Sequence, residues 1–148
     1  MIVTGAQILL KTRKLNPSAK LPERSHEGDA GLDLFAVDDV PVDRHLLLIP
    51  TGVAIELPFG TVGLILDRSS MAIKGFHVYG GVIDSNYRGE VKVVLAKTVH
   101  GKVSDLIIKA GTKVAQLVIV PIILPDIYEV DNLSESDRGS NGFGSTGV

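Results

Sequence analysis

The sequence contains no cysteine, no long apolar run and no large excess of charge of either sign. Without cysteine, disulfide bridges, thiolate zinc sites and cysteine nucleophiles are all excluded. The formal net charge of -2 at pH 7 gives no basic surplus that would favour nucleic acid or anionic lipid. Positive charge that meets an anionic ligand must therefore be local.

Membrane and export signals are also missing. The longest apolar stretch, residues 114–124, includes Gln116 and Pro121 and falls short of the roughly 20 residues that a spanning helix needs. Residues 1–10 are apolar in character, but they have neither a preceding basic region nor a small-residue cleavage site, so we expect a first strand and not a signal peptide. We therefore expect a soluble protein.

The histidines lack metal-ligand spacing. The four are scattered along the chain at His26, His45, His77 and His100. This distribution argues against a histidine-zinc site and favours solvated or capping histidines.

Short apolar segments make up most of the 148 residues. They are rich in Val, Ile and Leu and are interrupted about every eight to twelve residues by Pro, Gly, Asp or Asn, as is typical of a sandwich or barrel. The expected strands are residues 7–11, 32–37, 45–49, 52–56, 61–66, 91–97, 103–108, 113–120 and 127–130. We expect a short helical turn over 69–73 and a surface loop over 17–28. Because no helical periodicity, repeat or linker is present, we predict one all-β domain over 1–148, a jelly-roll-like sandwich or barrel.

Five short segments carry polar residues that a plain β-sandwich does not need. In the first, residues 29–36, strand alternation places Leu32 and Leu34 on one face and Asp33 on the other. Asp33 either belongs to a loop entering an ordinary strand or aims its carboxylate at a cation or a magnesium-bound water. In the second, residues 67–72, a strand gives way to a helical turn. Arg68, serine hydroxyls and backbone amides there can cradle phosphate oxygens, or the segment is a capped helix with a surface arginine.

The third and fourth segments combine turns with buried or reactive polar groups. Within residues 79–90, a pair of glycines lets backbone approach a ligand, and residues 84–89 have the composition of a hairpin turn. A turn alone does not need Asp84 and Tyr87 three residues apart, a spacing that permits a carboxylate at a reacting atom with a ring beside it. Residues 109–117 are typical of a turn into a buried strand, in which Gln116 must find partners, structural or ligand.

The fifth segment, residues 138–147, alternates glycine with serine and threonine. Composition alone predicts a disordered tail over residues 132–148. The exposed amides and Arg138 also suit an anion, although the Walker and dinucleotide-binding patterns are both absent. A flexible arm that orders on ligand binding is the better interpretation, since Phe143 has no core to join.

In this order, the five segments resemble the trimeric dUTPase family. GVIDSNYRGE and RGSNGFGSTG are highly specific for it, AGLDLFA and KVAQL moderately so, and DRSS is weak alone. The resemblance extends from Asp29 to Val148. It implies an intracellular jelly-roll homotrimer with three active sites at subunit interfaces. It also implies hydrolysis of dUTP to dUMP and diphosphate with Mg²⁺, which keeps uracil out of DNA and supplies dUMP for thymidylate synthesis.

The resemblance implies roles for individual residues. Asp84 matches the carboxylate that activates the attacking water, and Tyr87 matches the ring that packs against deoxyribose. Asp33 matches the acid that approaches the magnesium through water, while the substrate phosphates mainly hold the metal. The residues that match the uracil-reading hairpin and its facing strand are Gly81, Val82, Ile83 and Lys92. The residues that match phosphate-chain ligands are Arg68, Ser69, Ser70 and Gln116. The residues that match the lid over uracil and phosphates are Arg138, Phe143, Gly144, Ser145 and Thr146.

Three departures from the family pattern stand in this sequence. Asp67 replaces a common proline and adds negative charge near the phosphate ligands, Lys113 replaces a common arginine, and Asn86 replaces a common acidic residue.

Two other functions remain open. A dCTP deaminase resembles the fold and the Arg-Ser-Ser segment, but Asp84 and Tyr87 in Gly-Val-Ile-Asp-x-x-Tyr favour the pyrophosphatase. A protein-binding regulator with the same fold would have lost part of the catalytic set, which here is intact.

Overall fold

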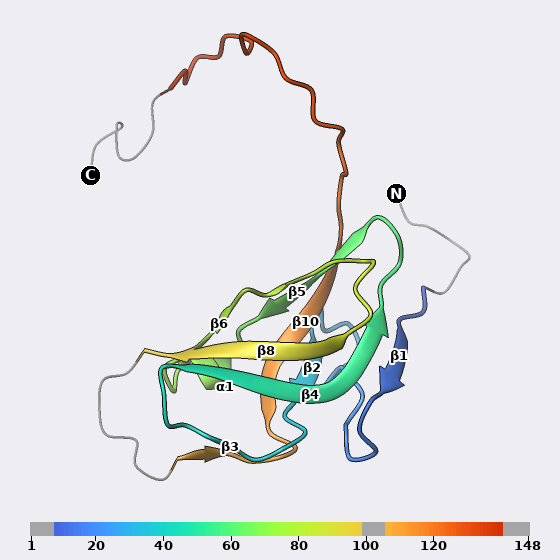
Figure 1. Cartoon of the computed structure of the whole chain (residues 1–148), viewed down its shortest axis with the longest axis vertical. Coiled ribbons are helices and arrows are strands. Elements are labelled where there is room, and N and C mark those ends of the chain that lie inside the picture. Colours follow the sequence, from blue (N-terminus) through green and yellow to red (C-terminus); the bar gives the residue numbers. More distant parts are fainter. Residues whose placement is uncertain (1–7, 99–105, 141–148) are drawn as a thin grey trace.

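Antiparallel strands make up most of the structure, a computed structural model that describes residues 8–98 and 106–140. One four-stranded sheet has the order β1 (Lys11–Lys14), β4 (Leu46–Glu56), β8 (Glu90–Lys97) and β6 (Phe76–Tyr79). The other has the order β2 (Leu32–Phe35), β10 (Lys113–Pro121), β5 (Thr61–Leu66) and β7 (Val82–Ile83). A small third sheet pairs β3 (Val40–Pro41) with β9 (Ile107–Ile108), and α1 (Ser69–Ala72) connects β5 to β6 (Figure 1).

The hydrophobic core draws its side chains from both four-stranded sheets. Leu34 of β2 and Leu117 of β10 come from one sheet, and Ile49 of β4 and Leu95 of β8 come from the other, each 1% exposed or less. Shortening such a side chain to alanine costs roughly 2–5 kcal/mol, so this contact between sheets dominates the stability of the domain. The all-β prediction with one short helix is confirmed.

The predicted elements with strong local signals lie where the sequence placed them. Residues 61–66 form β5, and the strands expected at 32–37, 91–97 and 113–120 correspond to β2, β8 and β10 within two residues at each end. The helical turn expected at 69–73 is α1. Among the described residues, none belongs to a helix long and apolar enough to cross a membrane.

Two expected strands are wrong. Of residues 7–11, only Lys11 belongs to a described strand, because β1 is a polar edge strand that pairs Lys11 with Glu56 of β4. Charged edges protect a sheet from pairing with other chains, so this strand carries no apolar pattern. Residues 127–130 form no strand; Ile127 is 100% exposed, and β-propensity without a partner strand is not enough. The strand expected at 103–108 is confined to β9, and residues 99–105 lie outside the described part of the chain.

The two strands expected at 45–49 and 52–56 are one strand, β4. Its pairing with β8 shifts register between Pro50 and Ala54, and Gly52 sits in this bulge with a φ of 67°. A Cβ at Gly52 would lie 2.9 Å from the side chain of Ala19, so a glycine lets the strand bend without ending. β3, β6 and β7 were not expected, since each has four residues or fewer.

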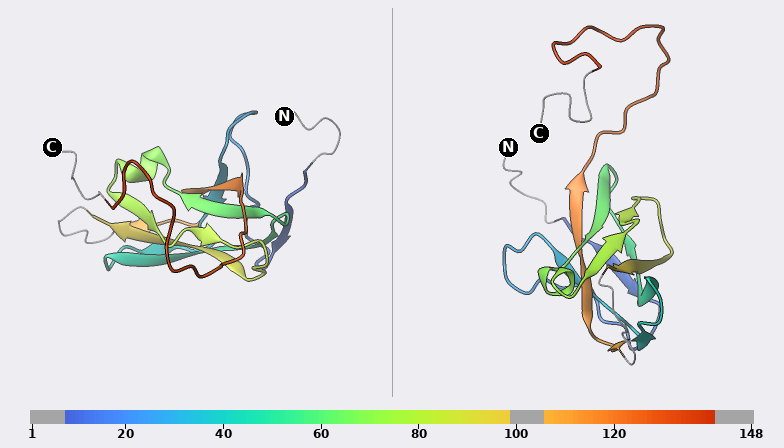
Figure 2. Two further views of the ribbon diagram at one scale, coloured as in Figure 1. Left: turned by 90° about the horizontal axis from the view of Figure 1, so that it is seen from above. Right: turned by 90° about the vertical axis from the view of Figure 1, so that its left-hand side faces the viewer.

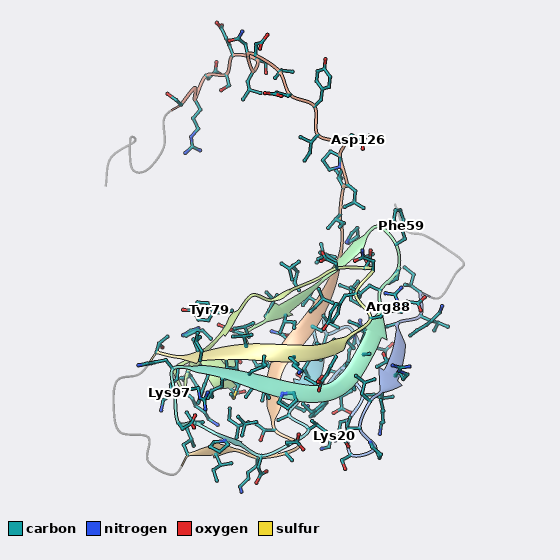
Figure 3. The ribbon with its side chains drawn as sticks, in the orientation of Figure 1. Lys20, Phe59, Tyr79, Arg88, Lys97 and Asp126 are labelled. Atoms are coloured by element: carbon teal, nitrogen blue, oxygen red, sulfur yellow. The ribbon has the colours of Figure 1, made fainter. Side chains whose placement is uncertain are left out.

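The chain leaves the sandwich at the end of β10. Residues 122–140 run away from the sheets as an extended segment, with Asp126 clear of the domain (Figures 2 and 3). Ile123 and Tyr128 on this segment are 90% and 85% exposed. Large apolar side chains in this state are typical of a surface that a partner covers.

Candidate active site

One candidate pocket lies at the end of a sheet, where β2, β10 and β5 meet. Gln116 of β10 pairs in register with Asp33 of β2 and with Leu66, the last residue of β5. Arg68 follows two residues later, so the topology brings it beside Asp33. This cavity of about 430 Å³ is called the Arg68 pocket. The residues that line it are Ser25, His26, Asp29, Ala30, Gly31, Asp33, Arg68, Ser69 and Gln116.

Asp33 organises the positive charge at this pocket. Its Oδ1 lies 2.8 Å from Arg68 Nε, and its Oδ2 lies 2.7 Å from Lys113 Nζ and accepts a hydrogen bond from Ser25 Oγ. Burial raises the pKa of Asp33, but hydrogen bonds from Lys113 and Ser25 and the charge of Arg68 outweigh it and bring the pKa below its ordinary value. The buried carboxylate therefore stays charged and holds Arg68 and Lys113 at the pocket.

Gln116 has a structural partner in this pocket. Its Nε2 donates to the backbone carbonyl of Asp67 at 2.8 Å, and its Oε1 lies against Gly31, where an added Cβ would come within 2.1 Å. The amide of a partly buried glutamine is thus satisfied, as the sequence required. Gly31 is needed for close approach and not for its backbone angles.

The second candidate pocket surrounds the turn that follows β7. It has a volume of about 200 Å³ and is called the Asp84 pocket. The residues that line it are Val82, Ile83, Asp84, Tyr87, Glu90 and Lys92. Tyr87 N–H donates to the Asp84 carbonyl at 3.1 Å and closes the turn, which leaves the Asp84 side chain exposed. The Lys92 ammonium lies 3.4 Å from Glu90.

Glycines fit this hairpin to its neighbours. Ile65 N–H of β5 donates to the carbonyl of Gly81 at 2.7 Å, and a Cβ at Gly81 would lie 2.3 Å from the Ile65 carbonyl oxygen. Tyr87 folds over Gly89, where a Cβ would lie 2.4 Å from the phenol oxygen, and donates from this oxygen to the Glu90 carbonyl at 3.0 Å. These contacts therefore hold the hairpin against β5 and fix the orientation of the Tyr87 ring.

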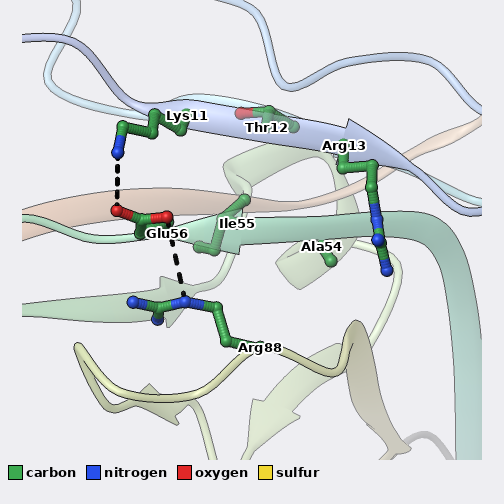
Figure 4. A pocket seen from close by; sticks show the side chains of 7 residues that line it. All are labelled: Lys11, Thr12, Arg13, Ala54, Ile55, Glu56 and Arg88. Carbon is green, nitrogen blue, oxygen red and sulfur yellow. Dashed lines mark hydrogen bonds and ion pairs between the residues drawn. The ribbon is translucent and has the colours of Figure 1, made fainter.

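Arg88 supports the same turn, a role that the sequence analysis did not predict. Its Nη1 donates to the carbonyls of Ser85 and Tyr87 at 2.7 and 2.9 Å. Its Nε lies 3.9 Å from Glu56, which in turn accepts from Lys11 Nζ at 2.8 Å (Figure 4). Because Glu56 and Lys11 lie far from Arg88 in the chain, no local pattern could have indicated this support.

The two pockets are separate within one chain. Among the residues that the structure describes, none lines both. Ile83 pairs with Gly63 near the start of β5, whereas Arg68 follows the end of β5. The part of β5 that lies beside Asp84 precedes residue 67 by about five residues, a path of roughly 17 Å at the rise of a β-strand. The two pockets therefore lie at different places along β5.

Two other predicted residues, Ser70 and Arg138, line neither pocket. Ser70 is exposed beside Arg68, whose Nη1 lies 3.4 Å from the Ser70 hydroxyl. Arg138 lies on the segment that follows β10. The predicted lid residues that fall outside the described part of the chain are Phe143, Gly144, Ser145 and Thr146.

The carboxylates of the Arg68 pocket limit how a metal can bind. Among the described residues, no group of three or more His, Cys, Asp or Glu could hold an ion. The pocket has two carboxylates, Asp29 and Asp33. Magnesium commonly keeps several waters and uses one or two carboxylates together with substrate phosphates. The residues present fit an ion that arrives on a phosphate chain.

Comparison with known proteins identifies the family. The family model described as dUTPase matches residues 17–147. A deoxyuridine 5'-triphosphate nucleotidohydrolase of Corynebacterium diphtheriae is 44% identical over 144 residues, which cover 95% of this chain and 93% of that protein. The G164S mutant of the dUTPase of Staphylococcus bacteriophage 80alpha, solved with dUpNHpp, superposes with a TM-score of 0.84 at 30% identity, and the match covers 96% of this chain and 100% of that chain.

A second solved structure is also similar. It is the dUTPase of phage phi11 of S. aureus, described with a structural Mg(II) ion, at a TM-score of 0.77 and 31% identity over 86% of this chain and 100% of its own. The separate Arg68 and Asp84 pockets thus occur in a chain whose sequence and fold agree with dUTPases over nearly its whole length. The chain belongs to the dUTPase family.

Proposed function

We propose that this chain hydrolyses dUTP to dUMP and diphosphate, which keeps uracil out of DNA and supplies dUMP for thymidylate synthesis. The observation that carries the proposal is the hairpin of the Asp84 pocket. Gly81 fixes it against Ile65, and Asp84 and Tyr87 stand together at its turn in a chain of the dUTPase family. The Arg68 pocket supplies the charge that a triphosphate needs.

The exposed edge of β7 supports recognition of uracil. β7 lies at the edge of its sheet and pairs with β5 on one side only, so those peptide groups of residues 81–83 that face away from β5 are open to a base. Fixed donors and acceptors that fit uracil are left unpaired by cytosine, a mechanism worth about 10⁴ in discrimination. The close backbone leaves no room for a thymine methyl, and Tyr87 would exclude a ribose 2′-hydroxyl. Lys92 lies on the facing side of the pocket.

Asp84 is the proposed general base. Its exposed carboxylate takes a proton from a water molecule, which attacks the α-phosphorus, and general-base help of this kind contributes roughly 10²–10⁴-fold. Arg68, Ser69, Ser70 and Gln116 bind the phosphate chain, with Arg68 aimed by Asp33. When bound with the substrate, Mg²⁺ neutralises charge on the phosphates. Asp33 is the carboxylate that would approach the metal through water.

Active sites formed between copies of the chain follow from the separation of the two pockets. The separate positions of the two pockets support a site that combines the hairpin of one copy with the Arg68 pocket of another. We propose a homotrimer with three such sites. Residues 132–148 would act as a flexible arm of the single domain 1–148, with Arg138, Phe143, Gly144, Ser145 and Thr146 closing over uracil and phosphates and excluding water.

Diphosphate release from each nucleoside triphosphate, with Mg²⁺ and with EDTA, tests the function. We expect release from dUTP alone, and loss of most of the rate when EDTA removes the metal. Ammonia or dUTP formed from dCTP, without hydrolysis of dUTP, would identify a deaminase instead. Folded protein that leaves every nucleotide intact would favour a binding protein that kept the fold.

A further inference from the structure

Asp67 departs from the proline common in the family, and its side chain and backbone are both engaged. Its Oδ1 accepts from the backbone N–H of Val78 at 2.6 Å, and its Oδ2 lies 2.8 Å from Nδ1 of His77. Its backbone carbonyl accepts from Nε2 of Gln116 at 2.8 Å. A residue at the end of β5 is thereby joined to β6 of the opposite sheet and to β10 of its own.

These contacts close a loop around the phosphate-binding segment. Asp67 and His77 are ten residues apart in the chain, and the pair brings both ends of the loop together. Arg68, Ser69 and all of α1 lie inside the closed loop. We call the contacts of Asp67 with His77 and Val78 the Asp67 clasp.

The loop needs such a clasp because α1 cannot hold itself in place. It has four residues, and its N-cap, Arg68, makes no side-chain capping hydrogen bond. Isolated helices shorter than about 12–15 residues are marginal in water. Met71 anchors one side of α1 in the core at 5% exposure. The segment that precedes α1 and carries Arg68 therefore depends on the contacts of Asp67.

The orientation of the Asp67 carboxylate keeps its negative charge away from the residues expected to bind phosphate. Asp67 does not line the Arg68 pocket, because both of its side-chain oxygens turn toward β6. The negative charge lies beside an imidazole and a backbone N–H, and it does not face the place where phosphates would bind. The substitution that looked harmful in the sequence is thus oriented to support the pocket.

We propose that Asp67 is a positioning residue for binding of the phosphate chain: the Asp67 clasp fixes the loop that presents Arg68 and Ser69 to it. The inference rests on the proposed dUTP hydrolysis. Misplacement of binding groups by about 1 Å can cost 10²-fold in catalysis. A loop that is loosened and not displaced should lose less, and mainly in substrate binding.

Four variants separate positioning from general stability. Asp67→Ala removes the clasp, and His77→Phe removes its imidazole half. Asp67→Asn keeps the shape, since its Oδ1 can accept from the backbone N–H of Val78 and its amide nitrogen can donate to the imidazole of His77. Asp39→Ala is the matched control: Asp39, like Asp67, binds one basic side chain and one backbone N–H, here Lys109 Nζ at 2.8 Å and Ala110 at 2.9 Å, but it lines neither pocket.

Steady-state hydrolysis of dUTP gives the first measurement. For Asp67→Ala we expect KM to rise about tenfold while kcat changes less than about threefold, and for His77→Phe a smaller rise in KM. The KM of Asp67→Asn should remain within about threefold of the wild-type value. Asp39→Ala should keep the wild-type KM even if its melting temperature falls as far as that of Asp67→Ala. A wild-type KM in Asp67→Ala would overturn the proposal.

Calorimetric binding of dUpNHpp, with deoxyuridine as the ligand without phosphates, gives a readout independent of turnover. Asp67→Ala should weaken dUpNHpp about tenfold and leave deoxyuridine unchanged. Equal weakening of both ligands would overturn the proposal, because it would mean general damage to the site. Wild-type protein that binds dUpNHpp and does not hydrolyse dUTP would overturn the proposed function alone. Failure of the wild type to bind dUpNHpp would overturn both.

Discussion

Single residues in this protein take their roles from partners far away in the chain. Asp33 is buried and charged because Arg68, which follows β5, and Lys113 of β10 reach it, and Gln116 is satisfied by the Asp67 carbonyl. The sequence predicted which residue types would gather, because a carboxylate, an arginine and an amide have no place in a plain apolar strand. It could not predict the pairing, since Lys113 and Asp33 meet through strand register alone.

Asp84 is the residue whose replacement tests the proposed chemistry most directly. Asp84→Asn keeps the shape of the side chain and removes its basicity, so kcat for dUTP should fall by about 10²–10⁴. Binding of dUpNHpp should stay within about threefold of the wild type, because Asp84 does not line the Arg68 pocket. Diphosphate release at fixed times measures kcat, and calorimetry measures the binding of dUpNHpp.

The control for this variant is Asp43→Asn. Asp43 is an exposed carboxylate paired with Arg44, 2.9 Å away, and it lines neither pocket. Its turnover should equal that of the wild type. An Asp84→Asn enzyme with near-normal kcat would remove Asp84 from the mechanism, whatever its affinity.

At the scale of elements, the sequence predicted strands that bury an apolar pattern and missed those defined by their partners. β5 and β10 are central strands with continuous apolar character, and both lie where expected. β7 has two residues beside Gly80 and Gly81 and becomes a strand only through its pairing with β5. β4 was divided because Pro50 and Gly52 resemble a turn, although the bulge accommodates both.

The seating of β7 on β5 can be tested at Gly81. An alanine there would place its Cβ 2.3 Å from a backbone oxygen of Ile65, so the hairpin must move away from β5. Gly81→Ala should lose roughly 1–3 kcal/mol of stability, as overpacked sites do. Because Asp84 rides on this hairpin, kcat/KM for dUTP should also fall at least tenfold.

Gly60→Ala separates these two effects. Gly60 has a φ of 78° and open space around an added Cβ, so alanine costs roughly 1–2 kcal/mol through backbone strain alone. Thermal melting should show both variants destabilised, and only Gly81→Ala should lose kcat/KM. Equal activity in the two variants would mean that the position of the hairpin does not limit catalysis.

At the scale of the whole molecule, one chain carries two candidate pockets that lie at different places on the same sheet. The Asp84 pocket belongs to the β7 edge, and the Arg68 pocket belongs to the far end of the same sheet. Apolar side chains on residues 122–130 remain exposed, as expected if another copy covers them. The spacing of motifs along one chain does not show which copy of the chain would supply each part of a site.

Mixing two inactive variants tests whether copies share sites. Asp84→Asn disables the hairpin and leaves the Arg68 pocket intact, whereas Arg68→Ala does the reverse. If each site takes its hairpin from one copy and its pocket from another, random assembly of equal amounts should pair two intact halves in about one quarter of the sites. If each site lies within one chain, every site stays defective in one half and activity remains at the level of the two variants alone.

The two proteins should be coexpressed, or unfolded and refolded together, and their diphosphate release compared with that of the same variants mixed after folding. Activity near one quarter of the wild type after joint assembly, but not after late mixing, is the expected result; background activity in both would restrict catalysis to single chains.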